Sequence, residues 1–319
     1  MAYTFMGGFL AVSWTDFFQG ILMLLALIVL PWAVMNELGG IDQTLSTLNG
    51  MDATKLDLFH DFSLLGVLSL LAWGLGYFGQ PHILARFMAI DSPKSVPLSR
   101  RIAMSWMILA LIGAVGVGLA GAVYFVDAPL ANSETVFLAL SQAVFNPWVA
   151  GLLIAAILSA IMSTIDSQLL VCSSAITEDF YKRWFRPHAH DHELVWVGRF
   201  AVAAVALFAM FIALNPTSSV LELVSYAWAG FGAAFGPLII LAVYWPRLTR
   251  NGALSGIMLG ALTVIGWKQL SRGPLGIFDL YEIVPGFVIA SLACIFISRL
   301  GTPPSHTVVL GFRRMESEL

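Results

Sequence analysis

Long runs of apolar residues, each bounded by a short polar or charged segment, repeat along the whole chain. A run of about twenty such residues, coiled as a helix, crosses the roughly 30 Å hydrocarbon core of a bilayer. Runs of this kind predict eight transmembrane helices, at residues 17–36, 62–90, 102–125, 147–175, 196–214, 219–244, 252–268 and 284–300. The pattern therefore indicates an all-α polytopic membrane protein.

Two of these runs are too long for one straight crossing. The run at 62–90 is interrupted by Gly74, Gly76, Gly79 and Pro81, and the run at 147–175 also exceeds the usual length. Because glycine and proline weaken the backbone hydrogen bonding of a helix, we expect both spans to bend, break or continue into the membrane interface. The first fourteen residues indicate a glycine-broken apolar turn that leads directly into the first span.

The composition excludes a soluble enzyme. Of the 319 residues, 59% are hydrophobic and 11% are charged, and the mean hydropathy is +0.85. So few charged residues cannot cover a soluble surface of this size. The formal charge of -3 and the pI near 6.0 give no indication of a nucleic-acid partner. The partner that the composition indicates is the lipid bilayer.

The distribution of lysine and arginine predicts the orientation of the spans. Thirteen of the 16 basic residues fall on one side of the predicted spans, and three, Lys55, Lys268 and Arg272, fall on the other. Basic residues near span ends favour the cytoplasmic side, so we expect the thirteen to lie there. Because the number of spans is even, both termini of this chain are then also expected in the cytoplasm.

Asp166 is the one ionisable residue that lies deep in a predicted span, and such residues commonly mark a site. On the same helix Ala160, Ser163 and Thr164 are three and four residues apart, so they share a face. Two hydroxyl oxygens beside a small residue suit a weakly held monovalent cation, because neutral oxygens can replace its water. The spacing alone favours the alternative, in which the hydroxyls bond back to the helix and assist helix packing.

A second candidate site lies within the run at 62–90. Trp73, Tyr77 and Pro81 follow one another at intervals of four residues, which predicts a stripe on one helix face. Glycines between them allow another backbone to approach closely, and an apolar wall with an indole N–H and a phenol O–H suits a small amphipathic solute. Aromatic residues at this spacing are also typical of ordinary core packing.

Asp16 precedes the first predicted span. An aspartate in this place is typical of a helix N-cap, which is the interpretation we favour, although it can also attract a cation that enters from the cytoplasm. No motif for nucleophilic, metal-dependent or phosphate-binding catalysis occurs, so we expect no catalytic residue, no cofactor and no further metal site.

The chain resembles the solute:sodium symporter family in three long stretches. These are YTFMGGFLAVSWTDFFQ at 3–19, WGLGYFGQPHILARFMA at 73–89 and AIMSTIDSQLLVCSSAITEDFYK at 160–182. The resemblance implies the inverted-repeat fold of the leucine transporter and, from the bacterial members that it matches, import of L-proline coupled to a sodium ion across the bacterial cell membrane.

The resemblance also implies roles for the candidate residues. It implies that sodium binds at Ala160, Ser163 and Thr164 and that the substrate binds at Trp73, Tyr77 and Pro81. Asp16 matches an acidic position implicated in sodium-dependent transport. The role of Asp166 stays open between attraction of the ion and a structural hydrogen bond.

The family pattern predicts three parts in this chain. We expect the last helix of the first repeat and an extracellular loop at 1–61, the second five-helix repeat at 62–244, and two helices with a short cytoplasmic tail at 245–319. The rest of the first repeat, which holds the other half of the sodium ligands, is then missing. We therefore expect the 319-residue chain, expressed alone, to carry no sodium-coupled proline flux.

Three alternatives remain open from the sequence. A related symporter for another small solute, such as pantothenate, differs from the favoured interpretation only in its substrate. A transporter-like sensor fused to a histidine kinase is less compatible with the short segment after Leu300. A nonfunctional remnant of a longer transporter is the third.

Overall fold

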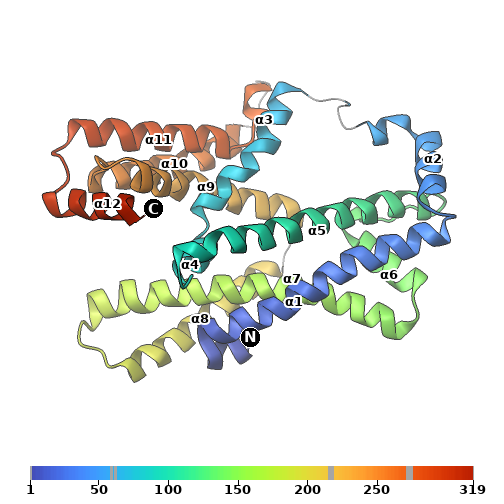
Figure 1. Cartoon of the computed structure of the whole chain (residues 1–319), viewed down its shortest axis with the longest axis horizontal. Helices are drawn as coiled ribbons and strands as arrows, with labels where there is room; N and C mark the ends of the chain where they lie inside the picture. Colours follow the sequence, from blue (N-terminus) through green and yellow to red (C-terminus); the bar gives the residue numbers. More distant parts are fainter. Residues whose placement is uncertain (1, 58–59, 61–62, 215–218, 271–275, 319) are drawn as a thin grey trace. The chain divides into compact units, whose positions relative to one another are not determined.

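The computed structural model of the protein describes residues 2–57, 60, 63–214, 219–270 and 276–318. These residues form helices and connections, with no strand among them, as the apolar pattern predicts (Figure 1). The expected position of Arg272 and the expected part boundary at residues 61 and 62 lie outside these ranges.

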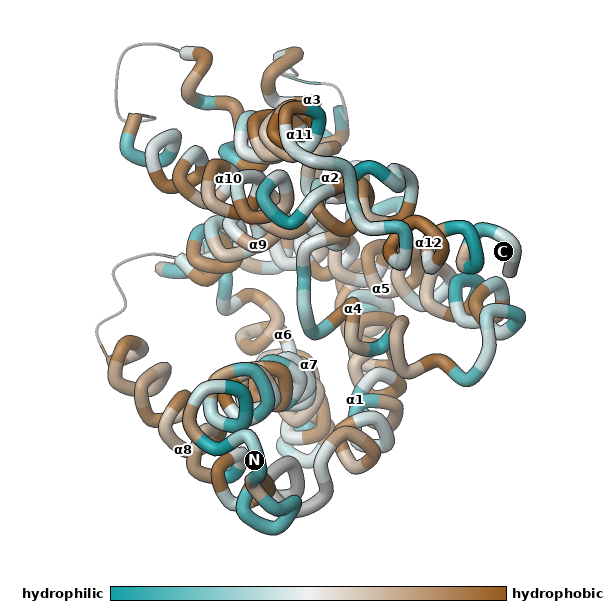
Figure 2. Tube along the Cα trace, turned by 90° about the vertical axis from the view of Figure 1, so that its left-hand side faces the viewer, coloured by the Kyte–Doolittle hydropathy of each residue, from teal (hydrophilic) through white to brown (hydrophobic). Residues whose placement is uncertain are grey.

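The number of membrane-spanning helices among the described residues agrees with the prediction of eight. Seven are long and apolar enough to cross a membrane, and a bent pair of helices makes an eighth when it is taken as one span. Figure 2 shows apolar residues recurring along α8 and α10, two of the helices concerned. The spans are Gly8–Glu37, Pro93–Tyr124, Pro147–Phe185, Asp191–Ala213, Val220–Tyr244, Arg250–Leu270 and Ile283–Leu300, with the bent pair Leu64–Gly79 and Pro81–Met88.

Contacts between residues divide the chain into two units. The first unit comprises Met1–His60 and Lys94–Met210, and the second comprises Asp61–Pro93 and Phe211–Leu319. This division follows packing and not the repeat of the sequence, so the three expected parts stay a prediction.

The first unit is built from α1 (Ala2–Glu37), α2 (Ile41–Met51), α5 (Val96–Tyr124), α6 (Val136–Val144), α7 (Pro147–Ser174) with its π-helical continuation η5 (Ala175–Phe185), and most of α8 (Asp191–Ala213). Its apolar core is formed by residues of α1, α5, α6 and α7. Leu30 and Val34 of α1, Leu140 of α6 and Leu153 of α7 are almost completely buried in this core. A Cβ added to Gly113 of α5 would overlap the backbone of α1, so the two helices cross closely there.

The second unit is built from α3 (Leu64–Ala72), the 3₁₀ segment η2 (Trp73–Gly79), α4 (Pro81–Met88), α9 (Val220–Tyr244), α10 (Arg250–Leu270), α11 (Ile283–Leu300) and α12 (His306–Glu318). Glycines at 252, 256 and 260 form one face of α10. A Cβ on Gly252 or Gly256 would overlap side chains of α11, and one on Gly260 would overlap the backbone of α9. Small residues thus allow these three helices to approach closely. Inside a membrane the hydrophobic effect does not favour contact with another helix over contact with lipid, so close packing drives helix association.

Both overlong runs depart from a straight α-helix, as expected. The run at 62–90 changes from α3 to the 3₁₀ segment η2, has extended backbone at Gln80 and restarts as α4 at a bend of 54°. The run at 147–175 continues from α7 into the π-helical stretch η5.

The interpretation of Asp16 as an N-cap is wrong. The helix is interrupted at Gly8, which has a φ of 58°, and Asp16 lies two turns inside the helical stretch that follows. Ser13 and Thr15 donate their hydroxyl protons to the carbonyls of Phe9 and Ala11. The backbone is helical on both sides of Asp16, so the start of this helix lies at the glycine and Asp16 caps no helix end.

Candidate functional site

One turn of α7 collects the predicted ion-binding oxygens. The Ser163 hydroxyl lies 3.0 Å from the Ala160 carbonyl oxygen and the Thr164 hydroxyl lies 3.3 Å from it, and both donate to it. The three oxygens therefore form a cluster on one helix face, as the spacing predicts. These are also the backbone bonds of the packing interpretation, so the sodium role of this turn stays a prediction.

Asp166 lies on the same helix and is 1% exposed. Next to it, the Ser167 hydroxyl donates to the Ser163 carbonyl oxygen at 2.7 Å, which fixes the polar turn from its C-terminal side. A carboxyl this deeply buried is costly unless its environment compensates it. The Asp166 carboxyl thus lies within one turn of the hydroxyl cluster.

Asp16 belongs to the same unit, on α1, which packs against α7. It is half-buried in the interior of its helix. One turn further on, the buried Oε1 atom of Gln19 has no hydrogen-bond donor among the described residues. The sequence interpretation missed Gln19. The only feature of the sequence that could have identified it is a polar amide side chain within an apolar run.

The aromatic candidates lie in the second unit, in a cluster with two residues that the sequence interpretation missed. The ring of Trp228 from α9 stacks on Trp73, with centroids 5.5 Å apart, and its indole N–H donates to the Trp73 carbonyl oxygen at 2.9 Å. Tyr77 meets Trp228 edge to face at 4.8 Å. The ring of Tyr281 lies nearly parallel to Trp73 at 6.2 Å. Trp73 and Tyr77 therefore contribute to one aromatic cluster with Trp228.

Glycines place this cluster, as the sequence predicts. A Cβ on Gly76 would overlap the Trp228 indole, and a Cβ on Gly79 would overlap the backbone of α9 at Phe231 and Gly232. The 3₁₀ segment η2 thus lies directly on α9 because its facing positions have no side chains.

The expected stripe of Trp73, Tyr77 and Pro81 on one helix face is wrong. Residues 73–79 form a 3₁₀ helix, in which positions three apart are in line and positions four apart are not. Pro81 lies beyond the extended residue Gln80, as the first residue of α4. Gln80 is buried and its side-chain amide donates to the Trp228 carbonyl oxygen at 3.3 Å. The break therefore separates Pro81 from the other two residues, and Gln80 joins them beside α9.

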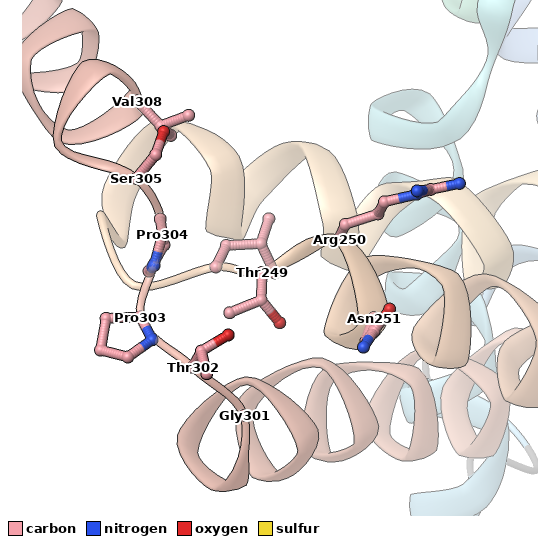
Figure 3. A pocket seen from close by; sticks show the side chains of 10 residues that line it. Thr249, Arg250, Asn251, Gly301, Thr302, Pro303, Pro304, Ser305 and Val308 are labelled. Carbon is pink, nitrogen blue, oxygen red and sulfur yellow. The ribbon is translucent and has the colours of Figure 1, made fainter.

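A further hollow of about 400 Å³ lies in the second unit, between the start of α10 and the connection from α11 to α12. Figure 3 shows Arg250 extending away from Pro303 and Ser305. Its lining includes the hydroxyl residues Thr249, Thr302 and Ser305 but none of the residues of the two candidate sites.

Comparisons with known proteins agree on one family. Residues 1–260 match the model of the Sodium:solute symporter family. The chain is 54% identical over 321 residues to the Sodium/proline symporter of Escherichia coli (strain K12) and 50% identical over 311 residues to the High-affinity proline transporter PutP of Bacillus subtilis (strain 168). These matches cover 99% and 97% of this chain but 63% and 65% of the relatives. The chain therefore spans just under two thirds of their length.

Solved structures share the fold, and one of them is a Na⁺-coupled sialic acid symporter in a substrate-bound outward-open state, with a TM-score of 0.75 at 21% identity, over 95% of this chain and 65% of that one.

Proposed function

Because the chain belongs to the sodium:solute symporter family, we propose that it serves in sodium-coupled import of L-proline across a bacterial cell membrane. The observation that carries this proposal is the 54% identity, over 99% of the chain, to a protein called a sodium/proline symporter. The thirteen basic residues on one side of the spans support a cytoplasmic location for that side and for both termini of this chain.

The sodium ion is proposed to bind at the polar turn of α7. Ser163 and Thr164 direct their protons to the Ala160 carbonyl, so the lone pairs of both hydroxyl oxygens are available to a cation. Neutral oxygens of this kind replace the hydration water of an alkali cation without holding it too tightly to be released. Asp166 and Asp16 add negative charge in the same unit and are proposed to favour entry of the ion.

Proline is proposed to bind at the aromatic cluster of the second unit. Tyr77 is 43% exposed and offers the accessible aromatic surface, while Trp73 lies against other rings. An aromatic face favours both the apolar ring and the positively charged amine of proline. The proline carboxylate is proposed to lie near Pro81, where the dipole of α4 favours negative charge.

Coupling in this proposal requires that sodium and proline each raise the affinity for the other. Sodium binds first, stabilises an outward-open state and orders the substrate site, and proline then binds to the ordered site. Thermodynamic linkage makes the two effects equal in size. An affinity for proline that does not change with sodium concentration would contradict this order.

Uptake by a chimera tests the proposed function. In it, this chain replaces the segment of the E. coli relative with which it aligns, and the chimera is expressed in cells without their own proline uptake. We expect uptake of labelled proline that needs sodium and is lost when choline replaces sodium. A competition panel with pantothenate and sugars identifies the solute. Sodium-driven uptake of one of these, with none of proline, would favour the alternative symporter.

Removing both hydroxyls of the polar turn separates ion binding from packing. In the chimera, Ser163→Ala with Thr164→Ala should raise the sodium concentration at half-maximal uptake at least roughly tenfold, since two of the proposed ligands are lost. Ser174→Ala, at an exposed serine at the end of the same helix, is the matched control and should leave this concentration within about twofold. A double variant that reaches the membrane in smaller amounts but keeps its sodium dependence would support the packing interpretation.

A further inference from the structure

The segment before α11 is fastened to its neighbours by specific bonds. It includes the 3₁₀ turn η6 (Gly276–Asp279) and Tyr281. The indole N–H of Trp267 from α10 donates to the Leu280 carbonyl oxygen at 3.0 Å, and its ring packs on Phe278 with centroids 4.7 Å apart. Tyr281 therefore extends from a segment that α10 holds in place.

Tyr281 connects three elements of the second unit. Its backbone N–H donates to the Ser69 hydroxyl of α3 at 2.9 Å, and its own hydroxyl donates to the Ser225 carbonyl oxygen of α9 at 2.7 Å. Between these bonds its ring lies 6.2 Å from the Trp73 ring, at an interplanar angle of 17°. Tyr281 thus contacts α3 through its backbone, and α9 and the first residue of η2 through its side chain.

The 3₁₀ segment η2 depends on such contacts for its position. Its 3₁₀ hydrogen bonds have poorer geometry than those of an α-helix, and three of its seven residues are glycines. Trp73 is held from α9 by the indole N–H of Trp228 and from the α11 side by Tyr281. The placement of Trp73 and Tyr77 is therefore set by side chains far along the chain, more than by η2 itself.

We propose that Tyr281 is a positioning residue for the substrate site. It holds Trp73 against α9 in the arrangement that accepts the substrate, and it acts through Trp73. This rests on the proposed function, in which Trp73 and Tyr77 bind proline. When only a fraction of molecules has the competent arrangement, the apparent affinity falls by that fraction, while the turnover of bound substrate is retained. The effect of Tyr281 therefore falls on the affinity for proline and on the discrimination between ring sizes.

The test uses the chimera described above and two substitutions of different severity. Tyr281→Phe removes only the hydroxyl bond to Ser225 and should raise the KM for proline about fivefold, the effect of one neutral hydrogen bond. Tyr281→Leu also removes the ring contact and should raise it at least roughly twentyfold. Tyr124→Leu is the control, because Tyr124 packs on Phe125 in the first unit and has no contact with the aromatic cluster among the described residues.

Readouts other than the KM distinguish positioning from a merely structural role. The maximal rate per molecule in the membrane and the half-saturating sodium concentration at saturating proline should stay within about twofold. Competition by the four-membered and six-membered ring analogues azetidine-2-carboxylate and pipecolate should strengthen relative to proline, because a loosened Trp73 discriminates ring size less.

The outcomes separate the two proposals. If the chimera with Tyr281 intact takes up no proline, the proposed function fails and this inference fails with it. If that chimera transports proline but Tyr281→Phe leaves both the KM and the analogue selectivity unchanged, the function stands and the positioning role of Tyr281 is overturned. An equal loss of maximal rate in Tyr281→Leu and Tyr124→Leu, with the KM unchanged in both, also overturns it.

Discussion

Replacing Gly79 with alanine tests whether backbone contact places η2 on α9. The added Cβ would lie 2.7 Å from the Gly232 Cα atom and 2.7 Å from the Phe231 carbonyl carbon. Ordinary contact begins at 3.4 Å and the Phe231 carbonyl oxygen lies nearer still, so the two backbones must separate by more than roughly 0.7 Å. No side-chain rotation relieves this overlap, because the obstructing atoms belong to the backbone. We expect Gly79→Ala to lower the free energy of unfolding by about 1–3 kcal/mol, as overpacking does elsewhere.

Gly74 offers a matched control in the same 3₁₀ segment. A Cβ there has no atom within 4 Å, and neither Gly74 nor Gly79 has a positive φ, so alanine is sterically allowed by the backbone at both positions. Gly74→Ala should leave stability unchanged or raise it by up to about 1 kcal/mol. The measurement is unfolding of the purified chain in detergent, followed by tryptophan fluorescence. Equal stability of the two variants would refute the argument that this contact places η2.

Two other substitutions have clear expected effects in the same unfolding measurement. Gly40 has a φ of 102° and open space around it, so Gly40→Ala should lower the free energy of unfolding by about 1–3 kcal/mol through backbone strain alone. Gly50→Ala, in the helix that follows, is the control and should not lower it. Equal effects of the two substitutions would contradict this reasoning. Trp267→Phe removes the hydrogen bond to the Leu280 carbonyl and should lower the free energy of unfolding by about 1 kcal/mol. Trp148→Phe, at a side chain that is 91% exposed, is the control and should not lower it. A decrease for Trp267→Phe no larger than that of the control would show that the bond contributes little.

The transmembrane spans could be predicted from the sequence because their cause is local. A helix is obligatory where a backbone crosses hydrocarbon, so apolar length alone identifies each crossing. The break in the run at 62–90 was equally local, since glycines and Pro81 lie where the 3₁₀ segment and the bend occur. The start of the first helix was not predicted, because Asp16 is a residue type that commonly caps helices and only the backbone conformation shows that the helix passes through it.

The two candidate sites differ in how much of each the sequence contains. The oxygens of Ala160, Ser163 and Thr164 lie within one helical turn, so their spacing predicts their proximity. The aromatic site is made by contacts between distant segments: the bond from Trp228 to the Trp73 carbonyl spans 155 positions. The spacing of residues along the sequence cannot predict a contact between two residues so far apart. The repeated glycines of α10 at 252, 256 and 260, by contrast, are a local signal of close helix packing.

Glycine and tryptophan in the aromatic site form a single packing feature. The indole of Trp228 occupies the space that a side chain on Gly76 would fill, and its N–H donates to the Trp73 carbonyl three residues earlier. Inside a membrane an unsatisfied carbonyl is costly, and apolar burial does not favour one helix contact over another. The Trp228 indole both satisfies the carbonyl and packs closely against η2, and its large ring fits there only because the facing backbone lacks a Cβ. The glycines make η2 a weak helix on its own. The same glycines also allow α9 to pack directly on it and hold it in position.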